Sequence, residues 1–243
     1  MNNFRSNFLS TIPPVVKNLI AINIIFLLAS SVMPTIFYRF GLNIDLNDIL
    51  GMHYWESPKF NPAQLITYAF MHGSFFHLFF NMFGLYMFGG ILEHVWGPKR
   101  FLIYYLITAI GAAVVQQIFW SVEYHSALTA INQAISSDVI NAPALIEQKR
   151  AFLNSPNFIT IGASGSIFGL LLAFGWLFPE QRLYLMFIPV PIKARIFVAG
   201  YCVIELFQGV ANFTGDNVAH FAHLGGALFG ALLIMFWKKK SRY

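Results

Sequence analysis

The chain has 243 residues, of which 57% are hydrophobic and only 10% are charged. Ordinary water-soluble domains carry about 25% charged residues, so this composition excludes a typical soluble fold and indicates an integral membrane protein. The net charge is +5, and the single cysteine, Cys202, has no partner for a disulfide. The fold therefore does not depend on an oxidising compartment.

Six apolar segments are long enough to cross a bilayer, for which about 20 residues are needed. In chain order they cover residues 18–37, 75–95, 101–120, 159–178, 196–213 and 218–237. They predict an all-α polytopic membrane protein in which residues 15–238 form one domain, a six-transmembrane-helix bundle. Residues 1–14 and the basic stretch 239–243 are predicted to be short cytoplasmic tails. The first segment lacks a small-residue cleavage site, so we interpret it as an anchor rather than a signal peptide.

The distribution of lysine and arginine predicts the orientation of the bundle. On a six-span plan, 11 of the 15 basic residues lie on the side of the two termini, and positively charged short loops stay in the cytoplasm. We therefore expect a multi-pass protein of the cell membrane with both termini cytoplasmic, and by default the cytoplasmic membrane of a bacterium. This topology, together with contact with the anionic lipid bilayer, explains the positive charge, so no nucleic-acid partner is expected.

Two long connections are predicted to face the outside. Residues 38–63 include Tyr54 and Trp55, and this composition is typical of a segment at the membrane interface. Residues 121–158 are the most polar stretch of the chain and contain short apolar patterns. We expect one or two amphipathic helices in this external loop.

Polar and ionisable side chains inside apolar spans are costly, so each one is a candidate for function. They are concentrated in the second, fourth and sixth spans, which hold His77 and Asn81 with His72 just before them, Ser164, and His220 and His223. At a rise of 1.5 Å per residue from the outer end of each span, Asn81, Ser164 and His223 lie roughly 8 to 9 Å deep. These three side chains are therefore predicted to share one site.

Glycine pairs follow two of these polar residues. Gly165 and Gly169 come after Ser164, and Gly226 and Gly230 come after His223, with three residues between the members of each pair. Small residues at this spacing let helix backbones approach closely. The pattern predicts that the fourth and sixth spans touch and bring the serine to the histidine.

The residue types in this group suit acyl-transfer chemistry. A serine hydroxyl is a weak nucleophile until a neighbouring base takes its proton, and a neutral imidazole is a suitable base near pH 7. Ser164 and His223 can take these two roles. The tetrahedral intermediate also needs hydrogen-bond donors for its oxyanion. His77 and Asn81, one helical turn apart, can supply them together with the backbone N–H of Ser164.

Three motifs resemble those of the rhomboid intramembrane serine proteases, in the family's order and on its spans. They are Gly162-Ala163-Ser164-Gly165, the His77-to-Asn81 pair with three residues between, and Ala222-His223-Leu224-Gly225-Gly226. The resemblance implies a rhomboid-like bundle that cuts transmembrane protein substrates near the outer end of a membrane segment with small or helix-destabilising residues. It implies no cofactor and no metal.

The resemblance also implies roles for individual residues. Ser164 is the expected nucleophile and His223 its base, with no third acid. His77, Asn81 and Gly162 are expected to line the oxyanion site. His72 corresponds to a polar position near a water-accessible cavity, and Glu93 to a structural glutamate. Phe168 stands where some members place a tyrosine that stacks on the catalytic histidine.

Two other functions share some of these features. A rhomboid-like protein that binds transmembrane helices without cutting would have the same fold, although it would be expected to lack Ser164 or His223. A metal transporter could use His72, His77, His220 and His223. It would need a carboxylate or thiol beside the histidines, and the outer half of the spans is not expected to offer one. On the protease interpretation, His220 is a tolerated interfacial residue and Glu205 faces the bundle.

Overall fold

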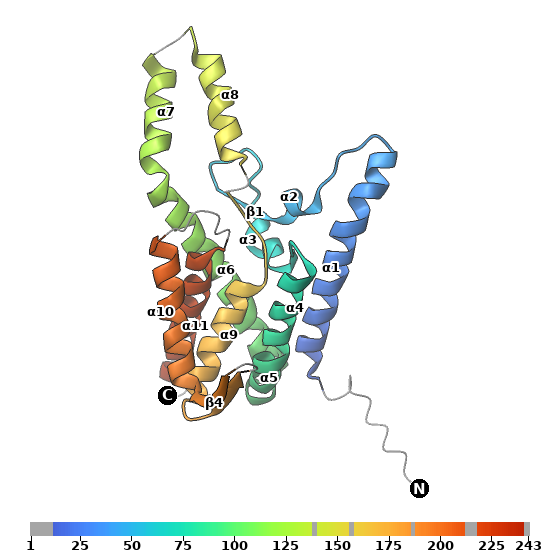
Figure 1. Cartoon of the computed structure of the whole chain (residues 1–243), viewed down its shortest axis with the longest axis vertical. Helices are drawn as coiled ribbons and strands as arrows, with labels where there is room; N and C mark the ends of the chain where they lie inside the picture. Colours follow the sequence, from blue (N-terminus) through green and yellow to red (C-terminus); the bar gives the residue numbers. More distant parts are fainter. Residues whose placement is uncertain (1–11, 138–139, 156–157, 186–187, 212–217, 241–243) are drawn as a thin grey trace.

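A computed structural model describes residues 12–137, 140–155, 158–185, 188–211 and 218–240 (Figure 1). Five helical segments in this part are long and apolar enough to cross a membrane. They are α1 (Pro14–Arg39), the continuous segment Phe75–Trp96, α6 (Pro98–Glu123), α10 (Ala194–Ala211) and α11 (His220–Lys240). The second of these joins α4 (Phe75–Gly84), a π-helical turn η3 (Leu85–Gly89) and α5 (Gly90–Trp96). The predicted all-α polytopic membrane bundle is thus confirmed.

The remaining predicted span, residues 159–178, is the fourth in chain order and contains α9 (Ser164–Leu177). This helix has only 14 residues, so the predicted span is wrong at its outer end. Ile159 and Thr160 instead form a short strand, β2, that pairs antiparallel with β1 (Met52–His53). The chain then passes Gly162, whose φ of 127° is incompatible with a continuing helix. Because the outer part of this pass is extended chain, Ser164 is the first helical residue rather than the sixth.

Close backbone packing brings α9 to α11 at the centre of the bundle. A Cβ atom added to Gly226 would collide with the carbonyl oxygen of Gly165, so the two backbones are in direct contact there. This confirms the predicted approach of the two helices. The second glycine of each pair serves a different contact, because Gly169 faces Thr108 and Gly230 faces Tyr104, both on α6. The pattern therefore packs three helices rather than two.

The predicted external loop contains two helices, as expected. Figure 1 shows α7 (His125–Ser137) and α8 (Ala142–Leu153) as a hairpin that extends beyond the bundle from the end of α6. Leu128 and Leu153 are buried at its base, in a cluster that includes Tyr54 and Phe158. The hairpin is thus attached to the bundle through the aromatic residues of the two outer connections.

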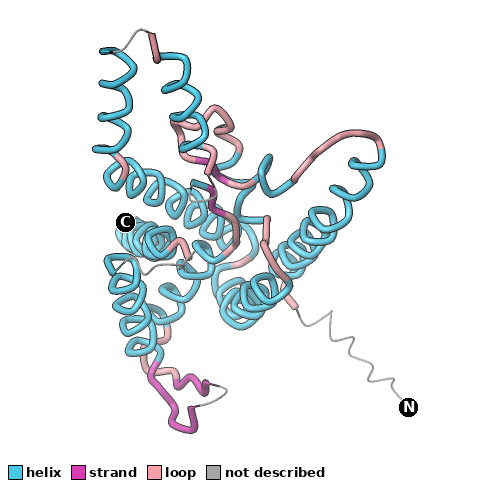
Figure 2. The backbone as a smooth tube through the Cα atoms, turned by 45° about the horizontal axis from the view of Figure 1, so that its top comes forward, coloured by secondary structure: helices cyan, strands magenta, loops and turns pink. Residues whose placement is uncertain are grey.

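Short strands occur at two places in the described part of the chain, as Figure 2 shows in magenta. Besides β1 and β2, the strands β3 (Arg182–Leu185) and β4 (Ile188–Lys193) form an antiparallel pair between α9 and α10. No pattern in the sequence indicated this pair. It lies at the end of the bundle opposite the α7–α8 hairpin, beside the start of α10 (Figure 1).

The first outer connection is fastened to the bundle at several points. It contains α2 (Leu46–Leu50), and it leads into α3 (Gln64–Thr67) and a 3-10 turn, η2 (Tyr68–Phe70). Gln117 of α6 accepts a hydrogen bond from the Trp55 backbone at 3.0 Å and donates one to the His53 carbonyl at 2.7 Å. Tyr54 is buried and stacks on Phe158 with a centroid distance of 5.4 Å. An interfacial position suits the exposed Trp55, whereas Tyr54 belongs to the packed interior.

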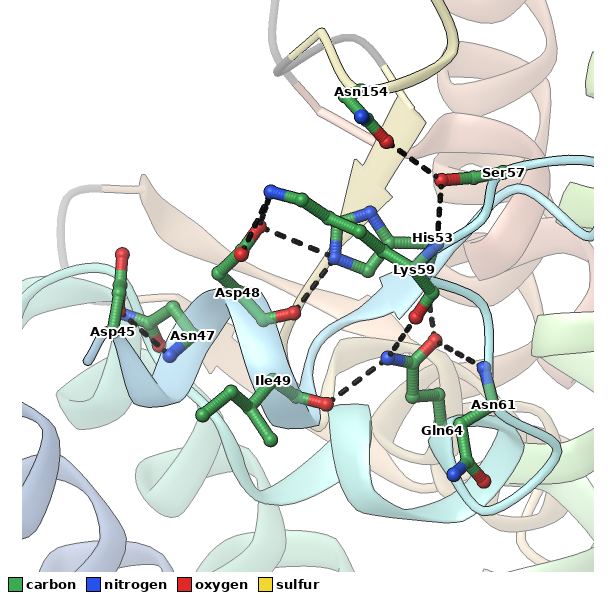
Figure 3. A network of polar contacts seen from close by, with 10 residues as sticks. All are labelled: Asp45, Asn47, Asp48, Ile49, His53, Ser57, Lys59, Asn61, Gln64 and Asn154. Carbon is green, nitrogen blue, oxygen red and sulfur yellow. Dashed lines mark hydrogen bonds and ion pairs between the residues drawn. The ribbon is translucent and has the colours of Figure 1, made fainter. Parts of the chain in front are cut away.

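A second group of polar contacts holds the same connection from within (Figure 3). The Gln64 amide donates to two backbone carbonyls of the connection at 3.0 and 3.1 Å. Asp48 accepts two hydrogen bonds from Lys59 at 2.8 Å. Ser57 donates to Asn154, just after α8, at 3.0 Å. The bond from Ser57 ties the first outer connection to the second, and the others hold the first connection together. The segment above the bundle is therefore a built layer rather than a loose loop.

Glu93 joins the inner ends of the first two spans. Its two carboxylate oxygens accept hydrogen bonds from the backbone N–H groups of Val15 and Val16, at 3.0 and 2.8 Å. These N–H groups are in the first turn of α1, where no intrahelical acceptor exists and where Pro13 offers no side-chain cap. The expected structural role of Glu93 is therefore a helix cap supplied by another helix.

At the other end of the chain, α11 extends to Lys240, two residues into the predicted tail.

Candidate active site

Ser164 and His223 meet where α9 and α11 come into contact. The Ser164 hydroxyl lies 2.8 Å from His223 Nε2, the distance of a good O–H···N hydrogen bond. The two residues are 59 positions apart in the sequence, and the contact confirms that the two spans bring the serine to the histidine, as the glycine pairs predict. The close packing at Gly165 and Gly226, one and three residues further along each helix, makes this approach possible.

The helix start gives Ser164 a second property. The first N–H groups of an α-helix have no intrahelical acceptor and carry the positive end of the helix dipole. Ser164 and Gly165 occupy the first two positions of α9. Their N–H groups are therefore available to an oxyanion that forms next to the serine oxygen.

His223 is held on its face and on its second nitrogen. The Phe168 ring stacks on the imidazole with a centroid distance of 4.4 Å and an interplanar angle of 6°, so the expected ring contact at this position is present. The carboxylate of Glu205 on α10 lies 2.9 Å from His223 Nδ1. The resemblance implied a serine and a histidine without an acid, whereas the structure places a buried acid at the histidine.

Glu205 also contacts the other histidine of α11. His220 Nδ1 lies 2.7 Å from the same carboxylate oxygen, Oε2, and all three residues are buried. The expectation that the outer half of the spans lacks a carboxylate beside the histidines is therefore wrong, and so is the interpretation of His220 as merely interfacial. On the predicted orientation the fifth span runs toward the outside, and Glu205, six residues before Ala211, lies about 9 Å from the last described residue of α10. Depth counted on all spans, rather than on three, would have found it.

Glu205, His220 and His223 each offer one possible metal-ligand atom, and these three atoms lie within 4.8 Å of one another. They could therefore hold a metal ion. The distances favour hydrogen bonds instead. Ligand atoms around a tetrahedral zinc, at about 2.0 to 2.2 Å from the metal, are about 3.4 Å apart. Glu205 Oε2 is closer than that to both Nδ1 atoms, at 2.7 and 2.9 Å. These distances fit hydrogen bonds from two Nδ1–H groups to one carboxylate oxygen, with each histidine in the Nδ1–H tautomer.

Gly162 and His77 form the wall beside Ser164. A Cβ atom added to Gly162 would lie 2.6 Å from His77 Nε2 and 3.7 Å from the Ser164 hydroxyl oxygen. The imidazole of His77 thus lies against the glycine, next to the nucleophile's segment, and only a residue without a side chain fits there. The structure brings together these two predicted site residues and Ser164.

Asn81 and His72 lie on either side of His77 in the sequence, and only His72 has a described ring contact with it. Asn81 lies one turn after His77 on α4 and is buried, and its side-chain nitrogen has no hydrogen-bond partner among the described residues. His72 precedes the helix and contacts His77, with ring centroids 4.9 Å apart. Burial, with a smaller contribution from His77, lowers the pKa of His72 to about 4, so this ring is neutral at pH 7. His72 therefore adjoins the site through its ring contact with His77.

The fold and the site thus define a polytopic helical membrane protein with a serine and a histidine paired between two of its membrane passes. Comparison with known proteins names the family. Residues 59–240 match the family model described as the Rhomboid domain. The chain belongs to the rhomboid family.

Several curated rhomboid proteins are similar to this chain. RHOMBOID-like protein 12, mitochondrial, of Arabidopsis thaliana is 33% identical over 171 residues, which are 69% of this chain and 44% of the relative. Rhomboid protein 1, mitochondrial, of Saccharomyces cerevisiae is 29% identical and covers 71% of this chain and 41% of its own length. Rhomboid-like protease 3 of Toxoplasma gondii is 24% identical and covers 79% and 58%. The chain thus spans about half the length of the curated relatives it matches.

Proposed function

We propose that this protein is an intramembrane serine endopeptidase that hydrolyses peptide bonds in or near the transmembrane segments of other membrane proteins. The observation that carries the proposal is the 2.8 Å contact between the Ser164 hydroxyl and His223 Nε2 inside a membrane bundle. A hydroxyl and an imidazole in this relation form an activated nucleophile. Membership of the rhomboid family and the name of the Toxoplasma gondii relative, a rhomboid-like protease, support it.

The first half of the reaction transfers the acyl group to the enzyme. Ser164 Oγ attacks the substrate carbonyl carbon as its proton moves to His223 Nε2, and the carbonyl electron pair moves to the oxygen. The N–H groups of Ser164 and Gly165, with His77 beside them, can donate to this oxyanion. When the C–N bond breaks, the proton on His223 passes to the departing amine.

The second half releases the acyl group. A water molecule gives its proton to His223 while its oxygen bonds to the acyl carbon. The new intermediate then expels Ser164 Oγ, which recovers the proton from His223. These steps use only side chains and backbone groups of the chain, and no cofactor or metal takes part in them.

The proposed substrate is a membrane segment that can leave its helical form at the outer end. A peptide bond inside a helix is enclosed by its neighbours, and its groups are already hydrogen-bonded. A segment with small or helix-destabilising residues can expose one bond to Ser164 at lower cost. Non-cutting binding of membrane helices by the same fold is the competing outcome of the test below.

In the orientation that we propose, both termini of the chain lie on the basic, inner side of the membrane. A bacterial cytoplasmic membrane was the initial expectation. The names of the Arabidopsis and yeast relatives specify mitochondria, so they give that location no support. The proposal concerns the orientation and not the choice between these membranes.

Cleavage of a single-span reporter protein by the purified full chain in liposomes tests the proposed function. The native chain is compared with Ser164→Ala and His223→Ala, each with and without a chelator. We expect cleavage by the native chain that is insensitive to the chelator, and no cleavage by either variant. Persistent cleavage by Ser164→Ala would overturn the assignment. Labelling of Ser164 by a fluorophosphonate supplies a readout that does not depend on the choice of reporter.

A further inference from the structure

We propose that Glu205 is a positioning residue of the site, which together with Ser164 and His223 forms a buried Ser-His-Glu triad, and that His220 holds the Glu205 carboxylate in place. This inference rests on the proposed function. The three groups form an unbroken chain of contacts, 2.8 Å from Ser164 Oγ to His223 Nε2 and 2.9 Å from His223 Nδ1 to Glu205 Oε2.

The first contribution of Glu205 is to the tautomer of His223. A neutral imidazole has one N–H group and one lone pair, and an ionised carboxylate can only accept. The contact with Glu205 therefore places the hydrogen on Nδ1 and leaves the Nε2 lone pair directed at the Ser164 hydroxyl. The opposite tautomer would present an N–H group to the serine and could not take its proton.

The second contribution is to the orientation of the ring. Phe168 lies parallel to the imidazole and packs on its face. A half-turn of the imidazole about its Cβ–Cγ bond leaves the ring in the same plane, so stacking alone permits both orientations. Phe168 also has no hydroxyl with which to bond its surroundings. The hydrogen bond from Nδ1 to Glu205 distinguishes the two orientations, because only one of them keeps it.

The third contribution is electrostatic. When His223 takes the serine proton, it becomes an imidazolium in a bundle with few charges. Glu205 is only 4% exposed, and opposite charges attract more strongly in such surroundings than in water. A carboxylate at the second nitrogen stabilises the imidazolium, which is the role of the acid in Ser-His-Asp sites on unrelated folds.

His220 explains how a buried carboxylate can stay ionised at this depth. An isolated charge in a membrane segment is costly, and such groups pair with donors. His220 and His223 lie three residues apart on α11, so both rings face the same side of the helix. Each presents Nδ1 to Glu205 Oε2, at 2.7 and 2.9 Å. His220 therefore holds the same carboxylate oxygen that His223 contacts.

Reporter cleavage by the full chain in liposomes tests this assignment with Glu205→Gln, Glu205→Asp and His220→Gln. For Glu205→Gln we expect kcat to fall by about 10²- to 10⁴-fold with KM nearly unchanged, as when the acid of a triad is neutralised. The dependence of kcat/KM on pH should also change in Glu205→Gln, because no carboxylate then pairs with the imidazolium that forms on His223 during the reaction. Glu205→Asp should recover part of kcat, and His220→Gln should lower it by a smaller factor.

Glu93→Gln is the matched control, since Glu93 is an equally buried glutamate that bonds only backbone groups far from Ser164. It should lower the thermal midpoint without moving the pH profile of the folded protein. The triad is overturned if folded Glu205→Gln and Glu205→Asp both keep kcat within about threefold of native with the native pH profile. It is also overturned if a chelator abolishes native activity, which would make the cluster a metal site. Loss of the proposed function itself is recognised separately, by a native chain that neither cleaves nor labels at Ser164.

Discussion

The ring of Phe168 lies flat on the imidazole of His223, with 4.4 Å between the ring centroids and 6° between the planes. Aromatic pairs contribute about 0.5 to 1.5 kcal/mol beyond the area they bury. Phe168→Leu keeps an apolar side chain and loses the flat face. We expect kcat to fall by about three- to tenfold, because His223 spends less time in the reactive plane.

Phe174→Leu is the control for this change, since Phe174 is buried on the same helix and contacts Phe88 and Phe178 instead of the site. Both variants should lower the thermal midpoint of the purified protein. Only Phe168→Leu should lower the rate of reporter cleavage per folded molecule. Equal rates for the two variants would show that the stacking does not contribute to catalysis.

Gly162→Ala should disable the site while most of the fold survives. Its φ of 127° is in a region that costs other residues about 1 to 3 kcal/mol, and the new methyl group would displace the His77 ring. Misplacement of catalytic groups by about 1 Å can cost about 100-fold in rate, and we expect a loss of that size in reporter cleavage.

Gly41→Ala separates strain from displacement. Gly41 has a φ of 74° and nothing within 4 Å of an added Cβ, so it carries the conformational cost alone. Its thermal midpoint should fall and its cleavage rate per folded molecule should stay within about twofold of native. A Gly162→Ala protein as active as Gly41→Ala would contradict the placement of His77 against the nucleophile's segment.

Gly226→Ala tests whether the contact between α9 and α11 sets the distance between Ser164 and His223. The added methyl group would meet the Gly165 carbonyl oxygen, so α11 must move away, and such overpacking costs about 1 to 3 kcal/mol. We expect a lower thermal midpoint and a loss of cleavage of about 100-fold. Gly200→Ala, at an open position in α10, should leave activity unchanged and raise the midpoint, since alanine is the better helix former. Native activity in a folded Gly226→Ala protein would contradict the packing.

The pH dependence of stability should carry a signature of His72. Its pKa in the folded protein is lowered to about 4, whereas an unfolded histidine titrates near 6.5. Between these values the unfolded chain binds a proton that the folded chain does not, so stability is present above pH 6.5 and is lost as the pH falls toward 4. The full difference is about 3 kcal/mol.

Thermal unfolding of the detergent-solubilised protein between pH 7.5 and 4 measures this effect. His72→Gln should show a smaller fall of the midpoint than the native chain over that range. His94→Gln, which replaces an exposed histidine on α5, is the control and should follow the native curve. A His72→Gln curve parallel to the native one would show that burial of this ring does not destabilise its protonated form.

Sequence patterns predicted the parts of the site that use a repeated spacing or a polar residue in an apolar span. Ser164, His223 and the glycine contact at Gly165 belong to this group, and so does the wall residue His77. The helical hairpin in residues 121–158 was also predictable, since amphipathic patterns are local. These features depend on neighbours in the sequence or on the cost of polarity in a membrane.

Other features depend on contacts between segments far apart in the sequence. The outer part of the fourth pass is apolar and long enough for a helix, and only its pairing with Met52 and His53 makes it a strand. The sequence identifies Glu205 as an acid that faces the bundle, but its histidine partners are 15 and 18 residues away on another helix. Spacing along the chain does not connect them, and only a count of depth on the fifth span would have placed Glu205 near the histidines. The glutamine contacts that fasten the first outer connection are likewise visible only once α6 is placed beside it.

The short length of α9 has a consequence for the supply of water. Fourteen helical residues span about 21 Å, whereas the hydrocarbon core is about 30 Å thick, which leaves about 9 Å of this pass without a helix. Hydrolysis consumes one water molecule for each bond, and a full-length helix would have buried its midpoint in a region that water does not enter. By starting α9 late, the fold places the half-buried Ser164 hydroxyl at a helix end, just after the β1–β2 pair, where we expect water to reach it on the proposed orientation.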